Sequence, residues 1–119
     1  MSSAALQVEA FQQLLRECVM TSQGLEGLAQ AFFPKAAAIV LTPWTLAANQ
    51  DLAYPRTQGE RPADLAEGAQ YFAALDALTA EDVEVHRLLV EVFHLVKPLA
   101  AIHEEPLRSR VLARQQQRQ

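Results

Sequence analysis

Histidine and carboxylate side chains stand at helical spacing in the C-terminal half of the sequence. Glu91 and His94 form an ExxH pair, and His86 lies eight residues before His94. In a helix this spacing brings the three side chains toward one side, as a mononuclear metal site requires. Glu91, however, flanks the apolar positions of its segment. We therefore favour the alternative, polar residues at the boundary of a helix face, and predict no metal site.

Other reactive side chains lack the partners that catalysis needs. His103-Glu104-Glu105 precedes Pro106 and is either an acid–base device or an acidic cap of the next helix, and we favour the cap. Cys18 lies on an apolar stripe with no identifiable base, so we expect a buried, inert thiol rather than a nucleophile. No glycine-rich phosphate-binding motif follows a strand. We predict no catalytic and no cofactor-binding residue in this chain.

A long loop at residues 50–63 is the most specific feature of the sequence. Its length of about 14 residues exceeds the usual helix–helix connection, and such loops are often functional. Arg56 and Arg61 are either solvent-facing charges or forks that reach a phosphate, a carboxylate or a neighbouring domain. We expect Trp44 to anchor the start of the loop in the helical layer. The residues that we predict to contact a partner or another domain are Trp44, Tyr54, Arg56 and Arg61.

The elements that must position these residues are all predicted to be helices. Apolar residues recur at helical spacing in six segments, which are 4–20, 25–33, 35–49, 64–78, 80–97 and 107–115. Pro34 is expected to separate the second segment from the third, and Pro43 to kink or break the third near Leu41. No segment alternates as a strand does. We therefore predict an all-α fold of five or six helices in a small orthogonal or antiparallel bundle, forming a single helical domain over residues 1–119.

The predicted ends and faces of these helices are specific enough to check. Ser2 or Ser3 is expected to cap the first helix. Asp64 and Glu67 have the spacing of a capping box, and Thr79 is expected to cap the helix over 80–97. The first helix should bury Val8, Phe11, Leu14, Leu15, Cys18 and Val19, and the helix over 80–97 should bury Val85, Leu88, Leu89, Val92, Phe93 and Val96.

Charge and composition restrict the function classes. A net charge of −4 argues against a nucleic-acid binder held by phosphate contacts. Acids gather between Glu60 and Glu91 and arginines follow Leu107, which we interpret as a solvated acidic face and a basic terminal helix. With one cysteine, no secretory signal at the N-terminus and no apolar run near the roughly 20 residues of a membrane span, we expect a cytoplasmic protein without a membrane segment.

The run FFPKAAAIVLTPWTLAANQDLAYPRTQGERP resembles the C-terminal region of FAD-dependent oxidoreductases of the flavin monooxygenase and hydroxylase class, often seen in bacteria. The matching elements are Phe32-Phe33, Lys35, Trp44, Asp51-Leu52 with Pro55, and Thr57, Gly59, Arg61 and Pro62. Downstream, the similarity continues at Asp82, Val85, Leu95 to Pro98 and Arg110 to Leu112. The chain departs from the pattern at Pro34 and at Glu104-Glu105, and it lacks the family's FAD-binding domain.

The resemblance implies a helical segment related to FAD-dependent monooxygenases that is not catalytic alone. FAD would then belong to a parent or partner protein, and the partner would be a separate FAD-binding subunit or the chain itself. The alternative function, from the class of binding modules, is a small all-α protein-interaction or oligomerisation module that docks its surplus apolar surface on a partner.

Overall fold

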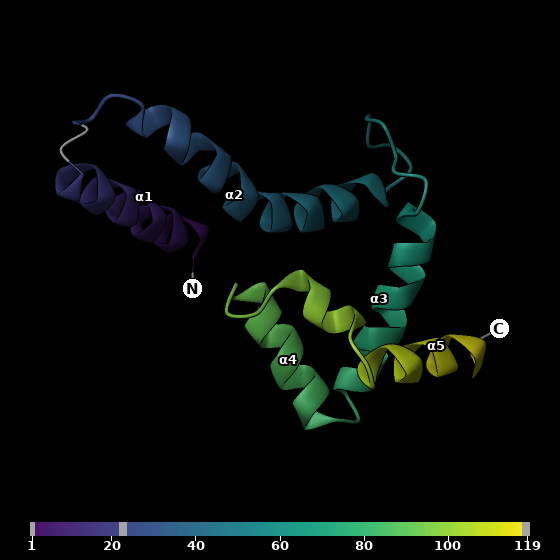
Figure 1. Ribbon diagram of the computed structural model, residues 1–119. Helices are drawn as coiled ribbons and strands as arrows, with labels where there is room; N and C mark the ends of the chain where they lie inside the picture. The colour runs from purple at the N-terminus through teal and green to yellow at the C-terminus, as the bar shows by residue number, and fades with distance from the viewer. Residues whose placement is uncertain (1, 22–23, 118–119) are drawn as a thin grey trace. The chain divides into compact units, whose positions relative to one another are not determined.

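Every regular element is helical in the computed structural model, which describes residues 2–21 and 24–117 (Figure 1). The elements are α1 (Ser3–Met20), α2 (Leu28–Leu52), α3 (Leu65–Thr79), α4 (Val83–Phe93), the 3-10 helix η1 (Leu99–His103) and α5 (Leu107–Gln117). The predicted all-α fold class is thus confirmed. The chain divides into two compact units, an N-terminal unit (Met1–Thr45) and a C-terminal unit (Leu46–Gln119). Each unit is described by itself, and a single domain over 1–119 stays a prediction.

The N-terminal unit consists of α1 and the first part of α2, which run as an antiparallel hairpin (Figure 1). Ser2 caps α1 as predicted, because its hydroxyl accepts a hydrogen bond from the backbone N–H of Ala5 at 3.2 Å. The helices meet through an edge-to-face contact between Phe11 and Phe32, whose ring centroids are 5.3 Å apart. Leu14 is the buried residue of α1, whereas Val8 and Val19 are exposed. The predicted buried face of this helix is therefore only partly covered.

α2 is one continuous helix, so the predicted interruption at Pro34 and a break near Leu41 are wrong, whereas the alternative of a kink near Leu41 stays a prediction. Each proline removes one backbone donor from the helix, but Ala36 to Ala38 and Leu41 are strong helix formers that extend it past the missing bonds. The absence of a membrane segment stays a prediction. By length and composition, α2 could cross a membrane, with a mean hydropathy of 1.3.

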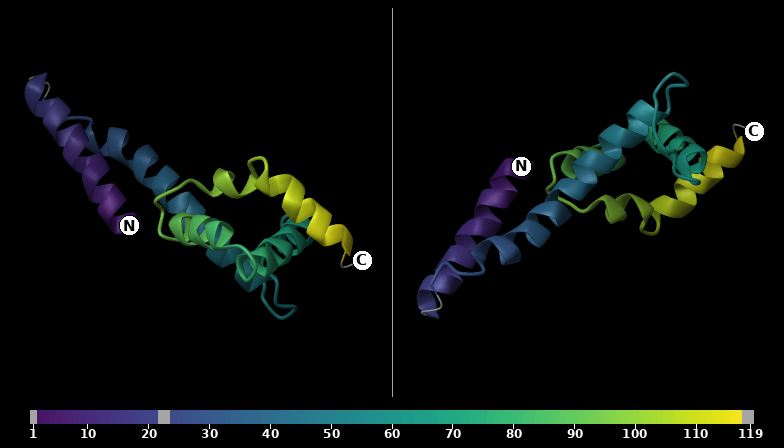
Figure 2. Two further views of the ribbon diagram at one scale, coloured as in Figure 1. Left: turned by 90° about the horizontal axis from the view of Figure 1, so that it is seen from below. Right: turned by 90° about the horizontal axis from the view of Figure 1, so that it is seen from above.

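The C-terminal unit encloses the core, which α3, α4, η1 and α5 form together (Figures 1 and 2). Its buried members are Tyr71, Ala74, Leu75, Leu78, Val85, Leu89, Val92, Ala101, Ile102, Leu107 and Val111. Within this core the Tyr71 hydroxyl donates a hydrogen bond of 2.6 Å to the Ile102 carbonyl, which ties α3 to η1. Burial raises the pKa of the Tyr71 phenol, since it disfavours the charged form.

The helix boundaries around α3 and α4 differ from the predicted ones. Asp64 is the N-cap residue of α3, but its side chain makes no capping hydrogen bond, so the expected capping box with Glu67 is not formed. Thr79 ends α3 instead of starting α4, and its hydroxyl donates to the Asp76 carbonyl at 2.6 Å. Asp82 is the N-cap of α4 and accepts from the backbone N–H of Glu84 at 2.9 Å. α4 therefore begins three residues later than predicted.

α4 also ends earlier than the predicted end before Pro98. The helix ends at Phe93, and Leu95 has a φ of 58°, in the left-handed region. The N–H of Val96 bonds to the carbonyl of Glu91 at 2.8 Å, and the N–H of Leu95 to the carbonyl of Val92 at 3.0 Å. These two bonds are the pattern of a Schellman motif, which usually has glycine at the left-handed position. A leucine in that position gave no sequence signal for the stop.

Candidate functional site

The predicted loop lies between Leu52 and Leu65, and Arg61 is used inside it. The guanidinium donates to three backbone carbonyls, those of Leu52 at 3.1 Å, Tyr54 at 3.0 Å and Thr57 at 3.0 Å. The Leu52 carbonyl belongs to the last turn of α2, where unpaired carbonyls and the helix dipole attract a positive charge. Arg61 thus organises the loop and caps the C-terminal end of α2. This role differs from both predicted ones, a solvent-facing charge and a contact with a phosphate, a carboxylate or a neighbouring domain.

Gly59 lets the loop lie close to α2. Its φ is 148°, a conformation that L-residues rarely adopt, and a Cβ built on it would lie 3.1 Å from Cδ2 of Leu52. A larger residue would therefore need both a strained backbone and a displaced leucine. Gly59 and Arg61 act on the same feature, because both hold the loop against the last residue of α2.

The other three residues of the predicted contact set point to solvent. Trp44 is 70% exposed and Tyr54 is 69% exposed, and Arg56 is exposed as well. The expected anchoring of Trp44 in a helical layer is therefore wrong. Trp44 belongs to the N-terminal unit and the remaining three to the C-terminal unit, so their grouping into one contact surface stays a prediction.

Glu91 of the ExxH pair makes two ion pairs. Glu91 contacts the ammonium of Lys97 at 2.8 Å and the guanidinium of Arg87 at 3.7 Å, and the hydrogen bond from Lys97 lowers the pKa of the Glu91 carboxyl. His86 and His94 are both exposed. Across residues 2–21 and 24–117, no three His, Cys, Asp or Glu side chains gather closely enough to bind a metal ion.

The cluster before Pro106 serves the fold. The His103 ring stacks on Tyr71 with centroids 4.6 Å apart. The Glu105 carboxylate accepts from the backbone N–H of Ser109 at 3.2 Å and from its hydroxyl at 2.7 Å, so it satisfies a free donor in the first turn of α5. The capping interpretation is the one that these contacts support. Cys18 is half-buried on α1, less buried than expected.

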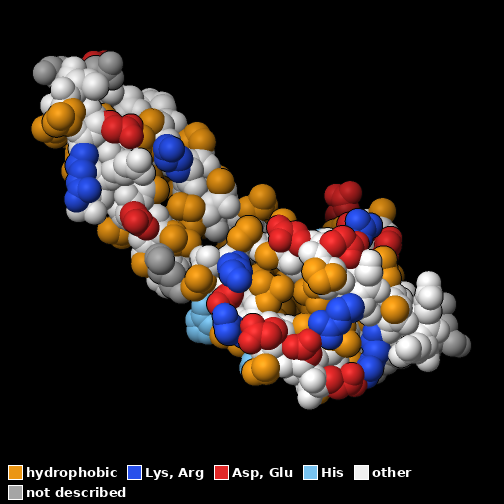
Figure 3. Space-filling view, turned by 60° about the horizontal axis from the view of Figure 1, so that its bottom comes forward, with side chains coloured by type: hydrophobic (Ala, Val, Ile, Leu, Met, Phe, Trp, Pro, Cys, Tyr) orange, Lys and Arg blue, Asp and Glu red, His pale blue; other side chains and the backbone are white. Residues whose placement is uncertain are grey.

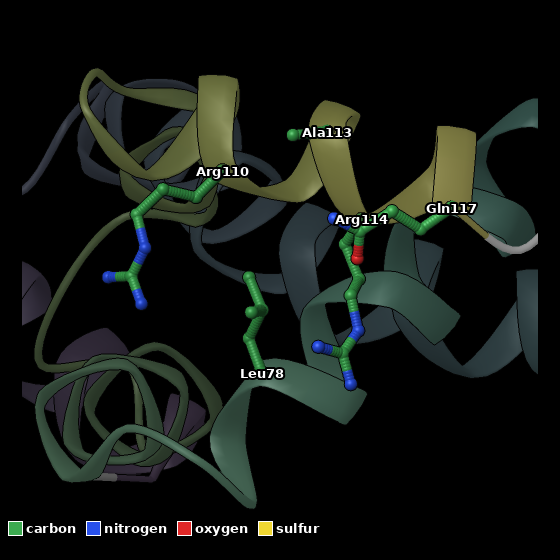
Figure 4. A pocket seen from close by; sticks show the side chains of 5 residues that line it. All are labelled: Leu78, Arg110, Ala113, Arg114 and Gln117. Atoms are coloured by element: carbon green, nitrogen blue, oxygen red, sulfur yellow. The ribbon is translucent and has the colours of Figure 1, made fainter.

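Two arginines of α5 hold that helix on its neighbours. Arg110 contacts the Asp82 carboxylate at 2.8 Å, and Arg114 makes a two-pronged contact with Glu81, with Nη1 to Oε2 at 2.9 Å. Figure 4 shows both side chains reaching from α5 on either side of Leu78. The open depression between them has a volume of about 250 Å³ and is lined by Leu78, Arg110, Ala113, Arg114 and Gln117. Because both guanidinium groups are paired, the depression offers no free charge to a ligand.

A row of apolar residues on α2 is exposed, and the sequence analysis did not predict this exposed surface. Phe33, Ala37, Val40 and Trp44 are separated by four, three and four residues, and all four are exposed. We call this row the α2 stripe. Figure 3 shows hydrophobic side chains at the surface of the N-terminal hairpin, where acidic and basic side chains lie among them. The spacing was a visible signal, but the same spacing is typical of a buried core face.

Comparison with known proteins adds no family. No family model matches the chain, and neither a curated protein nor a solved structure matches it.

Proposed function

We propose that this chain is an all-α interaction protein that docks on a partner through the apolar surface of its N-terminal unit. The observation that carries the proposal is the imbalance within that unit. Among its described residues, Leu14 alone is buried, whereas nine large apolar side chains are exposed. These are Val8, Phe11, Val19, Met20, Leu25, Phe33, Val40, Leu41 and Trp44.

The energetics favour a covered surface. Burying one leucine contributes about 1.5–3 kcal/mol, whereas ordering the backbone costs about 1–2 kcal/mol per residue. Helices in proteins gain most of their stability from packing of an apolar face, not from helix propensity. The hairpin therefore needs apolar contact from outside itself to be as ordered as α1 and α2 are. The C-terminal unit has its own enclosed core, so its helices do not need apolar contact from outside the unit.

A photo-crosslinking experiment tests this proposal in cells that produce the protein. A photoreactive phenylalanine analogue replaces Leu41, which is 62% exposed on α2, and in a matched control it replaces Val83, which is 74% exposed on α4. We expect discrete crosslinked products from position 41 and none from position 83. Crosslinks at neither position, or equal crosslinks at both, would refute docking through the N-terminal unit.

A relation to the C-terminal segment of FAD-dependent oxidoreductases is a second proposal. Phe33, Trp44 and Tyr54 lie in the run that carries this resemblance, and their exposure favours it, since a segment that packs on a flavin-binding body would leave such residues uncovered alone. Under this proposal the product crosslinked at position 41 is a flavoprotein. Identification of that product by mass spectrometry tests the relation, and a product without a flavin-binding domain would contradict it.

A further inference from the structure

We infer that the α2 stripe pairs with the α2 stripe of a second copy of this chain. The inference rests on the proposed function and names its partner. Phe33, Ala37, Val40 and Trp44 follow the alternation of four and three residues that places one seam along a helix. A seam with this repeat is the surface that packs against another helix, with knobs of one entering holes of the other.

The contact between α1 and α2 leaves this seam open. Phe32 contacts Phe11 of α1, and Phe33 is the next residue, about 100° further around the helix. Phe33 itself is 66% exposed. The hairpin can therefore keep its internal contact while the stripe packs against another helix, and two hairpins would assemble as a four-helix arrangement.

The stripe and its surroundings provide the area of an ordinary interface. Two thirds of an aromatic side chain amounts to roughly 100–170 Å², and Phe33 and Trp44 are both exposed to about this extent. Together they supply a quarter or more of the roughly 800 Å² that each partner buries in a standard interface. Leu41 and the exposed apolar side chains of α1 can supply much of the rest.

The distribution of charge on α2 permits a second copy as the occupant. Before Asp51, the charged residue of α2 is Lys35, which lies about half a turn around the helix from the centre of the stripe. Two identical stripes can therefore meet without bringing like charges together. Ala37, a small residue in the middle of the stripe, lets the two helices approach closely.

Site-directed disulfide formation in the purified full-length chain tests the pairing. Cys18 is the one cysteine, so a Cys18→Ser background carries either Val40→Cys, on the stripe, or Ala38→Cys, an exposed position about 160° away around α2. Under mild oxidation we expect Val40→Cys to form covalent dimers several times faster than Ala38→Cys. Light scattering of the unmodified chain should give a mass that rises from 13.2 kDa toward twice that value with concentration.

The possible negative results reject different parts of the proposal. Self-association with equal disulfide rates at the two positions would reject the stripe as the seam. A chain that stays monomeric over the whole concentration range would reject pairing, and so would a chain that stays monomeric in buffer but binds phosphatidylcholine vesicles. None of these results depends on the crosslinks at position 41. If pairing fails in these tests, a crosslink at position 41 to a different protein would still support the proposed function.

Discussion

Leu95 carries a backbone conformation that its side chain does not favour. Its φ of 58° closes the end of α4 through the hydrogen bonds of Leu95 and Val96 to the preceding turn. For an L-residue the left-handed conformation costs about 1–2 kcal/mol relative to the right-handed one, a penalty that glycine avoids. The leucine side chain is half-buried.

This conformation predicts an inverted order of stability for two substitutions. Leu95→Gly and Leu95→Ala both remove the packing of the side chain, but only alanine keeps a Cβ in the left-handed region. We expect the glycine variant to be more stable than the alanine variant by about 1 kcal/mol, the reverse of the usual order within helices. Urea unfolding of the two variants measures the difference. A more stable alanine variant would show that Leu95 is not held in this conformation in solution.

Substitution of Arg61 should disorder the loop around it and change the stability of the rest of the protein little. Arg61→Ala removes three hydrogen bonds to loop carbonyls, so residues 53–64 should lose order while the core of α3, α4 and α5 remains folded. Because the guanidinium is exposed, we expect a change in global stability below about 1 kcal/mol. Limited proteolysis should cleave this loop faster in Arg61→Ala than in wild type. Arg56→Ala, which alters an exposed arginine of the same loop, is the control and should leave the cleavage rate unchanged.

At the scale of elements, the junction between α3 and α4 is where α5 is attached. Asp82 has two roles at this junction. Its carboxylate caps α4 by accepting a hydrogen bond from the N–H of Glu84, and it forms an ion pair with Arg110 of α5. Glu81, the preceding residue, receives Arg114. The acidic segment and the basic terminal helix therefore pair with each other at this place. The expected solvated acidic face and basic helix need that correction, although Arg118 lies outside the described residues.

This junction predicts how stability depends on pH. The hydrogen bond from Arg110, followed by that from the Glu84 N–H, lowers the pKa of Asp82 below its ordinary value. A depressed pKa means that the folded state binds the proton less readily than the unfolded state. The stabilisation is therefore present above the ordinary pKa near 4 and is lost as pH falls through the lower folded value. Wild type should lose more stability between neutral and acidic pH than Asp82→Asn.

The Asp82→Asn variant is a suitable comparison because asparagine is as good an N-cap as aspartate. It keeps the cap of α4 and removes the titrating charge opposite Arg110. Thermal unfolding of both proteins from neutral to acidic pH is the measurement. Parallel losses for the two proteins would mean that Asp82 does not contribute to the pH dependence, leaving Glu91, whose pKa is also lowered, as the source.

At the scale of the whole molecule, the two units differ in what holds them together. The C-terminal unit has an enclosed core from Tyr71 to Val111, whereas the N-terminal unit relies on the contact of Phe11 with Phe32 and on Leu14. Regions with few buried apolar contacts open more readily than core elements. The N-terminal hairpin is therefore the part whose order should depend most on a partner.

Hydrogen exchange should reveal this difference. In dilute solution we expect the amides of α1 and of residues 28–45 to exchange faster than those of α3 and α4, because the hairpin opens at lower free energy. Its protection should increase with protein concentration if a second copy covers the stripe, since association stabilises by mass action. Uniform protection across both units at every concentration would contradict the weak internal packing that we describe.

The resemblance to flavoproteins predicts a negative result for the isolated chain. The structure has no strand within residues 2–21 and 24–117, and dinucleotides are commonly held where a glycine-rich turn joins a strand to a helix. We expect no change in the fluorescence or absorbance of FAD when the purified chain is added. Tight binding would overturn the prediction that any flavin belongs to a parent or partner protein. A cytoplasmic location likewise stays a prediction.

The sequence by itself determined the all-helical fold and part of the C-terminal core, although Phe93 and Val96, which were predicted to be buried, are exposed. The positions of Tyr71, Leu75, Val85, Leu89 and Val92 repeat at helical spacing, and all five are buried. Local chemistry was sufficient there, because neighbours one or two turns apart decide which face of a helix is apolar. The cap at Ser2 follows from the same short-range rule.

Tertiary structure decided where each apolar face finds a partner and where each long side chain reaches. The Phe33 and Trp44 spacing indicates a face, but only the fold leaves that face in water. Arg61 finds its acceptors on the backbone four to nine residues away, and Arg114 finds Glu81 33 residues away. A periodic pattern records which residues share a side of a helix. It does not record what lies opposite, because that depends on contacts between residues distant in the chain.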